Sequence, residues 1–189
     1  MNKPEPIGDE EVMYEGRIFE VVQQPHQIGD RVINFESARR APGVRLMIVH
    51  DGKMLITKEY RSELNGFDYR LPGGKVFDSL NEFQEARKLG KEMVEEAKLA
   101  AQREALEETG HVVEKMQHIH TTSPGATVSW DLYYFLIEDA HEHEDGQQLE
   151  DGEVITAMWK SFDEVKAMCL SGEIQEERSV AVLLKYLMS

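Results

Sequence analysis

The chain has 189 residues, a formal net charge of −15, one cysteine and 41% hydrophobic residues. Because this length suffices for one hydrophobic core, we expect residues 1–189 to form a single domain. The acidic charge disfavours nucleic acid and anionic membrane surfaces as partners, since their phosphates select basic patches. A phosphorylated small molecule remains compatible with it, because bound divalent cations invert the local field. Cys169 excludes an internal disulfide, and its apolar-periodic segment predicts a core residue.

Residues 1–11 are polar and contain two prolines, so we expect a flexible tail there. They have no apolar stretch typical of a signal peptide, and no later segment is long enough to span a bilayer. These features predict a soluble, cytoplasmic protein.

The first half of the chain is rich in predicted strands. Residues 17–23 and 31–38 alternate in polarity around Gly29-Asp30, which indicates a hairpin. Residues 44–50 and 53–59 flank Asp51-Gly52, the strongest short-range hairpin signal.

The second half combines helices and strands. Residues 79–109 favour a long helix with a break at Gly90. Strands are predicted at 112–120, 132–138 and 154–160, with a charged loop at 139–152 and helices at 162–170 and 179–188. Trp130 and residues 133–135 are interpreted as strand core. Mixed strands with helices able to cover both faces predict an α/β sandwich.

Three carboxylates in residues 103–110 stand out. In a helix, Glu104, Glu107 and Glu108 lie at i, i+3 and i+4 and share one face, with Arg103 one turn before Glu107 and able to pair with it. Such a triplet is either a solvated face or a cation site. We expect the helix to bury its opposite side and to present the acids outward. That opposite side carries Leu99, Ala105, Leu106 and Thr109.

The segment Arg-Glu-Ala-Leu-Glu-Glu-Thr-Gly at 103–110, preceded by Leu-Pro-Gly-Gly at 71–74, resembles the Nudix box, G-x5-E-x7-R-E-U-x-E-E-x-G-U. The box glycine would fall at Leu89, whereas Gly74 lies fifteen residues earlier. We interpret residues 76–94 as a helical insertion between the glycine turn and the box helix. Glu95 has the box spacing, although Glu96 lies nearer the carboxylate face of an unbroken helix. Ala105 and His111 replace larger aliphatic residues of the box.

Weaker matches outside the box look like the ADP-ribose and nucleoside-diphosphate-sugar pyrophosphatase branch of the Nudix hydrolases. They comprise residues 12–19, 39–44, 59–61, 123–125, 150–153, 159, 162–164 and 172–174. The resemblance implies an α/β/α sandwich with a mixed sheet. It also implies divalent-metal-dependent hydrolysis of the pyrophosphate bond of ADP-ribose or a nucleoside-diphosphate sugar, giving a nucleoside monophosphate and a sugar phosphate.

The resemblance also implies roles for individual residues. Hard Mg²⁺ or Mn²⁺ suits oxygen donors. The implied metal ligands are Glu104, Glu107, Glu108 and the carbonyl of Gly73. The base is sought in the acidic loop, with Glu153 or Asp151 favoured, Glu150 next, and Arg103 orienting Glu107. Guanidinium groups match phosphate geometry, which makes Arg39, Arg40 and Arg61 candidate substrate contacts.

Two other functions compete with this one. The chain could hydrolyse another nucleoside diphosphate derivative or a nucleoside triphosphate, or it could be a nucleotide sensor without turnover. An intact carboxylate set disfavours the sensor, which would need no metal ligands.

The insertion carries an apolar stripe at helical spacing. Its members are Leu80, Phe83, Ala86, Leu89, Met93 and Ala97. Such a stripe must be covered, either by a second copy across a two-fold axis or by the chain itself as a helical flap. The first alternative predicts a homodimer in which this segment contributes to the interface or walls the substrate cleft.

Overall fold

The computed structural model describes residues 3–62 and 64–189, and the chain divides into two compact units. One unit contains residues 1–42, 77–91 and 123–131, and the other contains residues 43–76, 92–122 and 132–189. The length of the chain predicted a single domain.

The N-terminal unit is built on a five-stranded sheet in the order β1-β3-β4-β9, with β2 also paired to β3. Its strands are β1 (Glu5–Pro6), β2 (Glu11–Glu15), β3 (Phe19–Ile28), β4 (Arg31–Arg40) and β9 (Val128–Ser129). The hairpin predicted around Gly29-Asp30 is confirmed as β3 and β4.

The described part of residues 1–11 pairs with β3 in places and does not form the predicted flexible tail. Glu5 pairs with Gln27, Glu11 pairs with Gln23, and the Ile7 N–H donates to the Pro25 carbonyl at 2.9 Å. Polarity suggested disorder, but the backbone groups along the second edge of β3 supply partners that composition does not reveal.

Helix α1 (Leu80–Lys88) also belongs to this unit. Ser79 caps it by accepting from the Glu82 N–H, and the predicted break follows at Gly90, whose φ is +65°. Leu80, Phe83 and Ala86 are buried, so the chain itself covers this part of the apolar stripe. Leu89 does not belong to the buried stripe, because it lies at the end of α1 and is 75% exposed.

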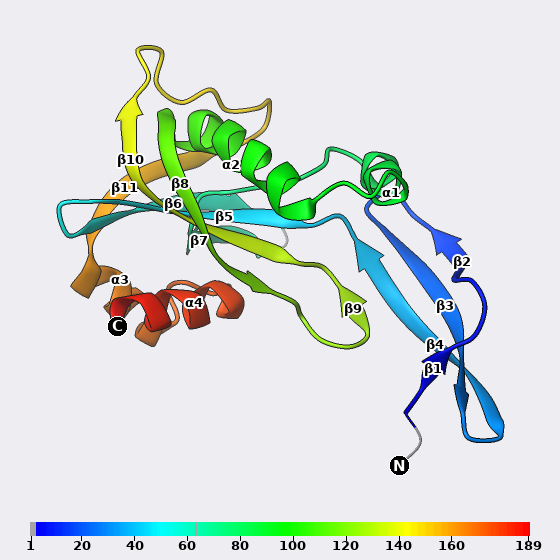
Figure 1. The fold of residues 1–189 in the computed structure, drawn as a ribbon. Coiled ribbons are helices and arrows are strands. Elements are labelled where there is room, and N and C mark those ends of the chain that lie inside the picture. The colour runs from blue at the N-terminus through cyan, green and yellow to red at the C-terminus, as the bar shows by residue number, and fades with distance from the viewer. Residues whose placement is uncertain (1–2, 63) are drawn as a thin grey trace. The chain divides into compact units, whose positions relative to one another are not determined.

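The second unit is an α/β/α sandwich (Figure 1). Its six-stranded sheet has the order β11-β6-β5-β10-β8, with β7 paired to β6, and only the β5–β10 pair is parallel. The strands are β5 (Gly43–His50), β6 (Lys53–Arg61), β7 (Gly66–Arg70), β8 (His111–Thr122), β10 (Leu132–Glu142) and β11 (Ile155–Ser161).

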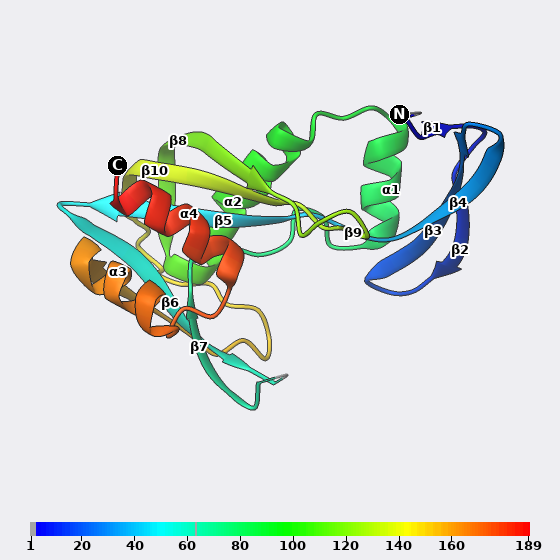
Figure 2. The same cartoon turned by 90° about the horizontal axis from the view of Figure 1, so that it is seen from below.

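Helix α2 (Met93–Thr109) covers one face of this sheet, and α3 (Phe162–Ser171) with α4 (Glu177–Leu187) covers the other (Figure 2). The mixed sheet between helical layers confirms the predicted fold class. Cys169 is buried, and so are Tyr133 and Tyr134, as predicted. Trp130 differs, because it follows β9 and is half-buried beneath the guanidinium of Arg40, 4.5 Å from the ring centre.

Helix α2 buries Ala105 and Thr109 as predicted, but Leu99 is exposed and Glu108 lies on the buried side. Ala97, Ala101 and Ala105 are fully buried, Leu99 is 63% exposed, and Glu108 is only 5% exposed. Alanine side chains let the helix approach the sheet closely, and Glu108 follows Ala105 on the same side. One carboxylate of the triplet therefore points into the unit and not outward.

None of the helices in the described parts of the chain is long and apolar enough to cross a membrane.

Candidate active site

A glycine turn occupies the edge of β5 where β6 diverges from it. The Leu46 N–H donates to the Pro72 carbonyl at 2.9 Å, and the Val44 N–H donates to the Gly74 carbonyl at 3.0 Å. A Cβ on Gly73 would lie 2.2 Å from the Val44 carbonyl oxygen, and the φ of Gly73 is +139°. Only glycine can bring the backbone this close to the strand in this conformation.

Two carboxylates of α2 lie against this turn. The Gly73 N–H donates to Glu108 Oε2 at 2.6 Å. A Cβ on Gly74 would lie 2.4 Å from Glu104 Oε1, so the absence of a side chain there makes room for the Glu104 carboxylate. The fold therefore places the Pro-Gly-Gly turn next to the box helix, although the insertion separates the two in the sequence.

The two carboxylates lack sufficient compensating positive charge. Burial raises the pKa of Glu104 to about 7, and the charge of Glu107 adds to the rise. Burial, followed by the charge of Glu59, raises the pKa of Glu108 well above its usual value, against the lowering effect of the Gly73 N–H. Desolvated acids with raised pKa values are favourable surroundings for a cation.

The donor chemistry fits a hard divalent cation with oxygen ligands. Among the described residues, no group of three or more His, Cys, Asp or Glu side chains converges closely enough to hold a metal by itself. The available donor set is therefore two carboxylates, Glu104 and Glu108, together with backbone carbonyls of the turn. Glu107 is half-buried, and its negative charge raises the pKa of Glu104.

Arg103 ties α2 to the turn. Its Nη2 donates to the Lys75 carbonyl at 2.9 Å and lies 3.5 Å from Glu104 Oε1. Its Nε lies 3.8 Å from Glu107 Oε2, which confirms the predicted i to i+4 pair. Arg103 thus contacts the carboxylates of Glu104 and Glu107 while it is anchored to the turn.

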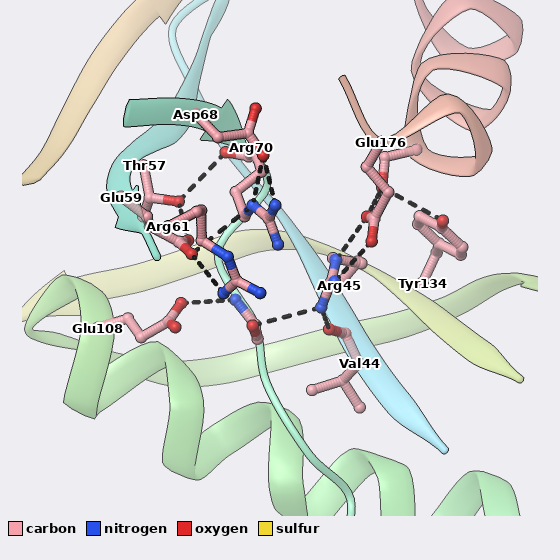
Figure 3. A network of polar contacts seen from close by, with 12 residues as sticks. Val44, Arg45, Thr57, Glu59, Arg61, Asp68, Arg70, Glu108, Tyr134 and Glu176 are labelled. Carbon is pink, nitrogen blue, oxygen red and sulfur yellow. Dashed lines mark hydrogen bonds and ion pairs between the residues drawn. The ribbon is translucent and has the colours of Figure 1, made fainter. Parts of the chain in front are cut away.

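Several charged residues next to the carboxylates were missed by the sequence analysis (Figure 3). Glu59 on β6 is 6% exposed and accepts from the Thr57 hydroxyl at 2.8 Å. Its Oε2 lies 3.6 Å from Arg70 Nε and 3.7 Å from Arg61 Nη1. A usable signal existed, because residues 57, 59 and 61 alternate along one strand and share a face.

The three predicted substrate arginines occupy different surroundings. Arg61 belongs to the same unit as the carboxylates, and its side chain is 37% exposed. Arg39 belongs to the N-terminal unit, where its buried Nε donates to Glu20 Oε1 at 2.6 Å. The other Glu20 oxygen accepts from Gln84 at 2.7 Å. Arg40, in the same unit, stacks on Trp130.

The acidic loop is exposed at Glu150, Asp151 and Glu153. The Glu150 N–H donates to Glu153 Oε2 at 3.1 Å, and the Glu153 N–H donates to the Glu150 carbonyl at 3.1 Å. Of these three residues, Glu153 contributes to the raised pKa of Glu104, so its charge acts on the carboxylate site. Glu95, in the first turn of α2, is exposed, and Glu96 is half-buried.

Comparisons with known proteins identify the family of this chain. Over 181 residues the chain is 23% identical to an ADP-ribose pyrophosphatase of Bacillus subtilis (strain 168), covering 94% of this chain and 89% of that protein. The crystal structure of an ADP compounds hydrolase superposes with a TM-score of 0.69 and 17% identity over 100% of this chain and 93% of the other, which shows a shared fold. The sequence model of the NUDIX domain matches residues 39–181. Enzymes with this domain generally use divalent metal ions. The chain therefore belongs to the Nudix hydrolase family.

Proposed function

We propose that this protein hydrolyses the pyrophosphate bond of ADP-ribose or of a nucleoside-diphosphate sugar, with Mg²⁺ or Mn²⁺ as cofactor. The observation that supports this most is the pair of desolvated carboxylates, Glu104 and Glu108, against the glycine turn. The name of the Bacillus subtilis relative supports the choice of substrate.

In this proposal Glu104, Glu108 and the Gly73 carbonyl hold the cation, and Glu107 adds negative charge. A divalent cation supplies charge neutralisation at the phosphate oxygens and lowers the pKa of bound water. Arg61 binds a phosphate oxygen through its guanidinium group.

The reaction itself needs a proton acceptor. We assign it to Glu153, whose charge already acts on Glu104, with Asp151, then Glu150 and Glu107, as the next candidates. The base takes a proton from water as the water oxygen bonds to one phosphorus. The bond from that phosphorus to the bridging oxygen breaks, and the products are a nucleoside monophosphate and a sugar phosphate.

A substrate panel tests this proposal. The purified protein is incubated with ADP-ribose, nucleoside-diphosphate sugars, dinucleoside polyphosphates and nucleoside triphosphates, with Mg²⁺ or with EDTA, and products are identified by mass. We expect AMP and ribose 5-phosphate from ADP-ribose, or the corresponding pair from a nucleotide sugar, only with Mg²⁺. Turnover confined to dinucleoside polyphosphates or nucleoside triphosphates would assign the enzyme to that substrate class instead. Binding without turnover would indicate a sensor.

We further propose a cytoplasmic homodimer that forms through the N-terminal sheet and not through the insertion. The support is a set of large apolar side chains on β2, on β4 and around the start of β3, each at least 41% exposed: Val12, Met13, Tyr14, Ile18, Phe19, Val32, Ile33 and Phe35. A chain with a net charge of −15 repels its own copies, so its self-association needs exposed apolar surface of this kind. Light scattering should give a dimer for the wild type and a monomer for Ile33→Glu with Phe35→Glu. A dimer of the double variant would reject this interface.

A further inference from the structure

A buried ion pair lies directly behind the glycine turn. Arg45, on β5, is 6% exposed, and its Nε and Nη2 donate to the two oxygens of Glu176 at 2.7 Å each. Glu176 precedes α4 and also accepts from the hydroxyl of Ser179, which is fully buried. The Tyr134 hydroxyl lies 3.2 Å from the Ser179 hydroxyl and closes the network (Figure 3).

The remaining nitrogen of the guanidinium reaches the turn. Arg45 Nη1 donates to the Val44 carbonyl at 2.8 Å and to the Gly73 carbonyl at 3.3 Å. The Gly73 N–H donates to Glu108. Gly73 is therefore held through its N–H by Glu108 and through its carbonyl by Arg45. The neighbouring carbonyls of Pro72 and Gly74 are held by backbone N–H groups of β5, and Gly73 depends on the arginine side chain instead.

The geometry points to Arg45 and Glu176 as positioning residues that aim the Gly73 carbonyl at the divalent cation, an inference that rests on the proposed function. A carbonyl oxygen has two lone pairs, so one hydrogen bond from Arg45 leaves the other pair for a cation. A lone guanidinium beside this carbonyl would repel that cation. The bidentate carboxylate of Glu176 neutralises it, so the pair gives direction without net positive charge.

The planar fork of Arg45 suits this arrangement better than a lysine would. Two of its nitrogens engage Glu176 while the third reaches the carbonyls of Val44 and Gly73. A lysine ammonium is a point charge without this planar fork and cannot span both partners. Glu176→Gln keeps the size of the side chain but leaves the guanidinium charge unbalanced beside the turn.

The test measures binding of Mn²⁺ alone, by electron paramagnetic resonance titration of the full chain. Because outer partners of metal ligands typically change affinity by about 10–100-fold, we expect the Mn²⁺ dissociation constant to rise about tenfold or more in Glu176→Gln and in Arg45→Lys. In ADP-ribose hydrolysis, kcat at limiting Mg²⁺ should fall and recover at high Mg²⁺, with little change in the KM for substrate. Glu164→Gln is the matched control, because it removes one exposed carboxylate from the first turn of α3 and should leave Mn²⁺ affinity unchanged.

Folding is checked for each variant by circular dichroism at the titration temperature. If Glu176→Gln or Arg45→Lys does not fold, Ser179→Ala decides, because it removes only the hydroxyl that supports Glu176 and should weaken Mn²⁺ binding severalfold. Folded variants with the wild-type Mn²⁺ dissociation constant would overturn the inference. Absence of both Mn²⁺ binding and turnover in the wild type would instead reject the proposed function.

Discussion

The metal-free protein should lose stability as the pH rises from 5 to 8. In the folded chain the pKa of Glu104 is raised from 4.5 to about 7, mainly by burial. A group with a raised folded pKa stabilises the fold fully below its unfolded pKa, and this stabilisation is lost as the pH rises through the folded pKa. At 1.36 kcal/mol per pH unit, the shift corresponds to about 3 kcal/mol. Glu108 acts in the same direction.

Thermal unfolding in EDTA is the assay. About 2.5 kcal/mol of the stabilisation by Glu104 is lost between pH 5 and pH 8, which for a chain of this size corresponds to a fall in Tm of roughly 5–10 °C. Glu104→Gln should show a smaller fall, because the contribution of Glu104 is removed and that of Glu108 remains. Mg²⁺ at pH 8 should restore the wild-type Tm, since the cation replaces the proton. Glu176 does not interfere, because Arg45 outweighs burial and lowers the pKa of Glu176 to about 2. A flat Tm across this range in EDTA would refute the electrostatic account of the site.

Three further substitutions test separate parts of the site. Glu108→Gln should abolish turnover at ordinary Mg²⁺ while the Tm in EDTA holds or rises, because a buried charge is removed; wild-type turnover would contradict its role as a ligand. Glu153→Gln should lower kcat with little change in Mn²⁺ affinity, and an unchanged rate would move the base to Asp151, Glu150 or Glu107. Gly73→Ala should destabilise the chain by about 3 kcal/mol in denaturant unfolding, because the new Cβ meets the Val44 carbonyl. Wild-type stability of this variant would show that the turn can move.

Local signals predicted much of the second unit. Asp51-Gly52 predicted the β5–β6 hairpin, and the box spacing predicted the helix that carries Glu104 and Glu108. The Arg103–Glu107 pair followed from helical geometry alone. These features depend on residues only a few positions apart, where dihedral preferences and periodicity carry the information.

Features that depend on distant pairing were not predictable. Arg45 interrupts an apolar strand, and its partner Glu176 lies 131 positions later. The burial of Glu108 depends on which side of α2 meets the sheet, and the alanines on that side gave a weaker pattern than the exposed Leu99. Glu5–Pro6 becomes a strand only because an edge of β3 is available to it. In each case the determining contact lies far away in the sequence.

The most direct test of the central claim is the hydrolysis of ADP-ribose by the wild type, Glu108→Gln and Glu164→Gln in parallel, with Mg²⁺ and with EDTA. We expect AMP and ribose 5-phosphate from the wild type and from Glu164→Gln with Mg²⁺, and no products from Glu108→Gln or from any sample with EDTA. Equal turnover by Glu108→Gln, or turnover that EDTA does not affect, would contradict a cation site formed by the box carboxylates and the glycine turn.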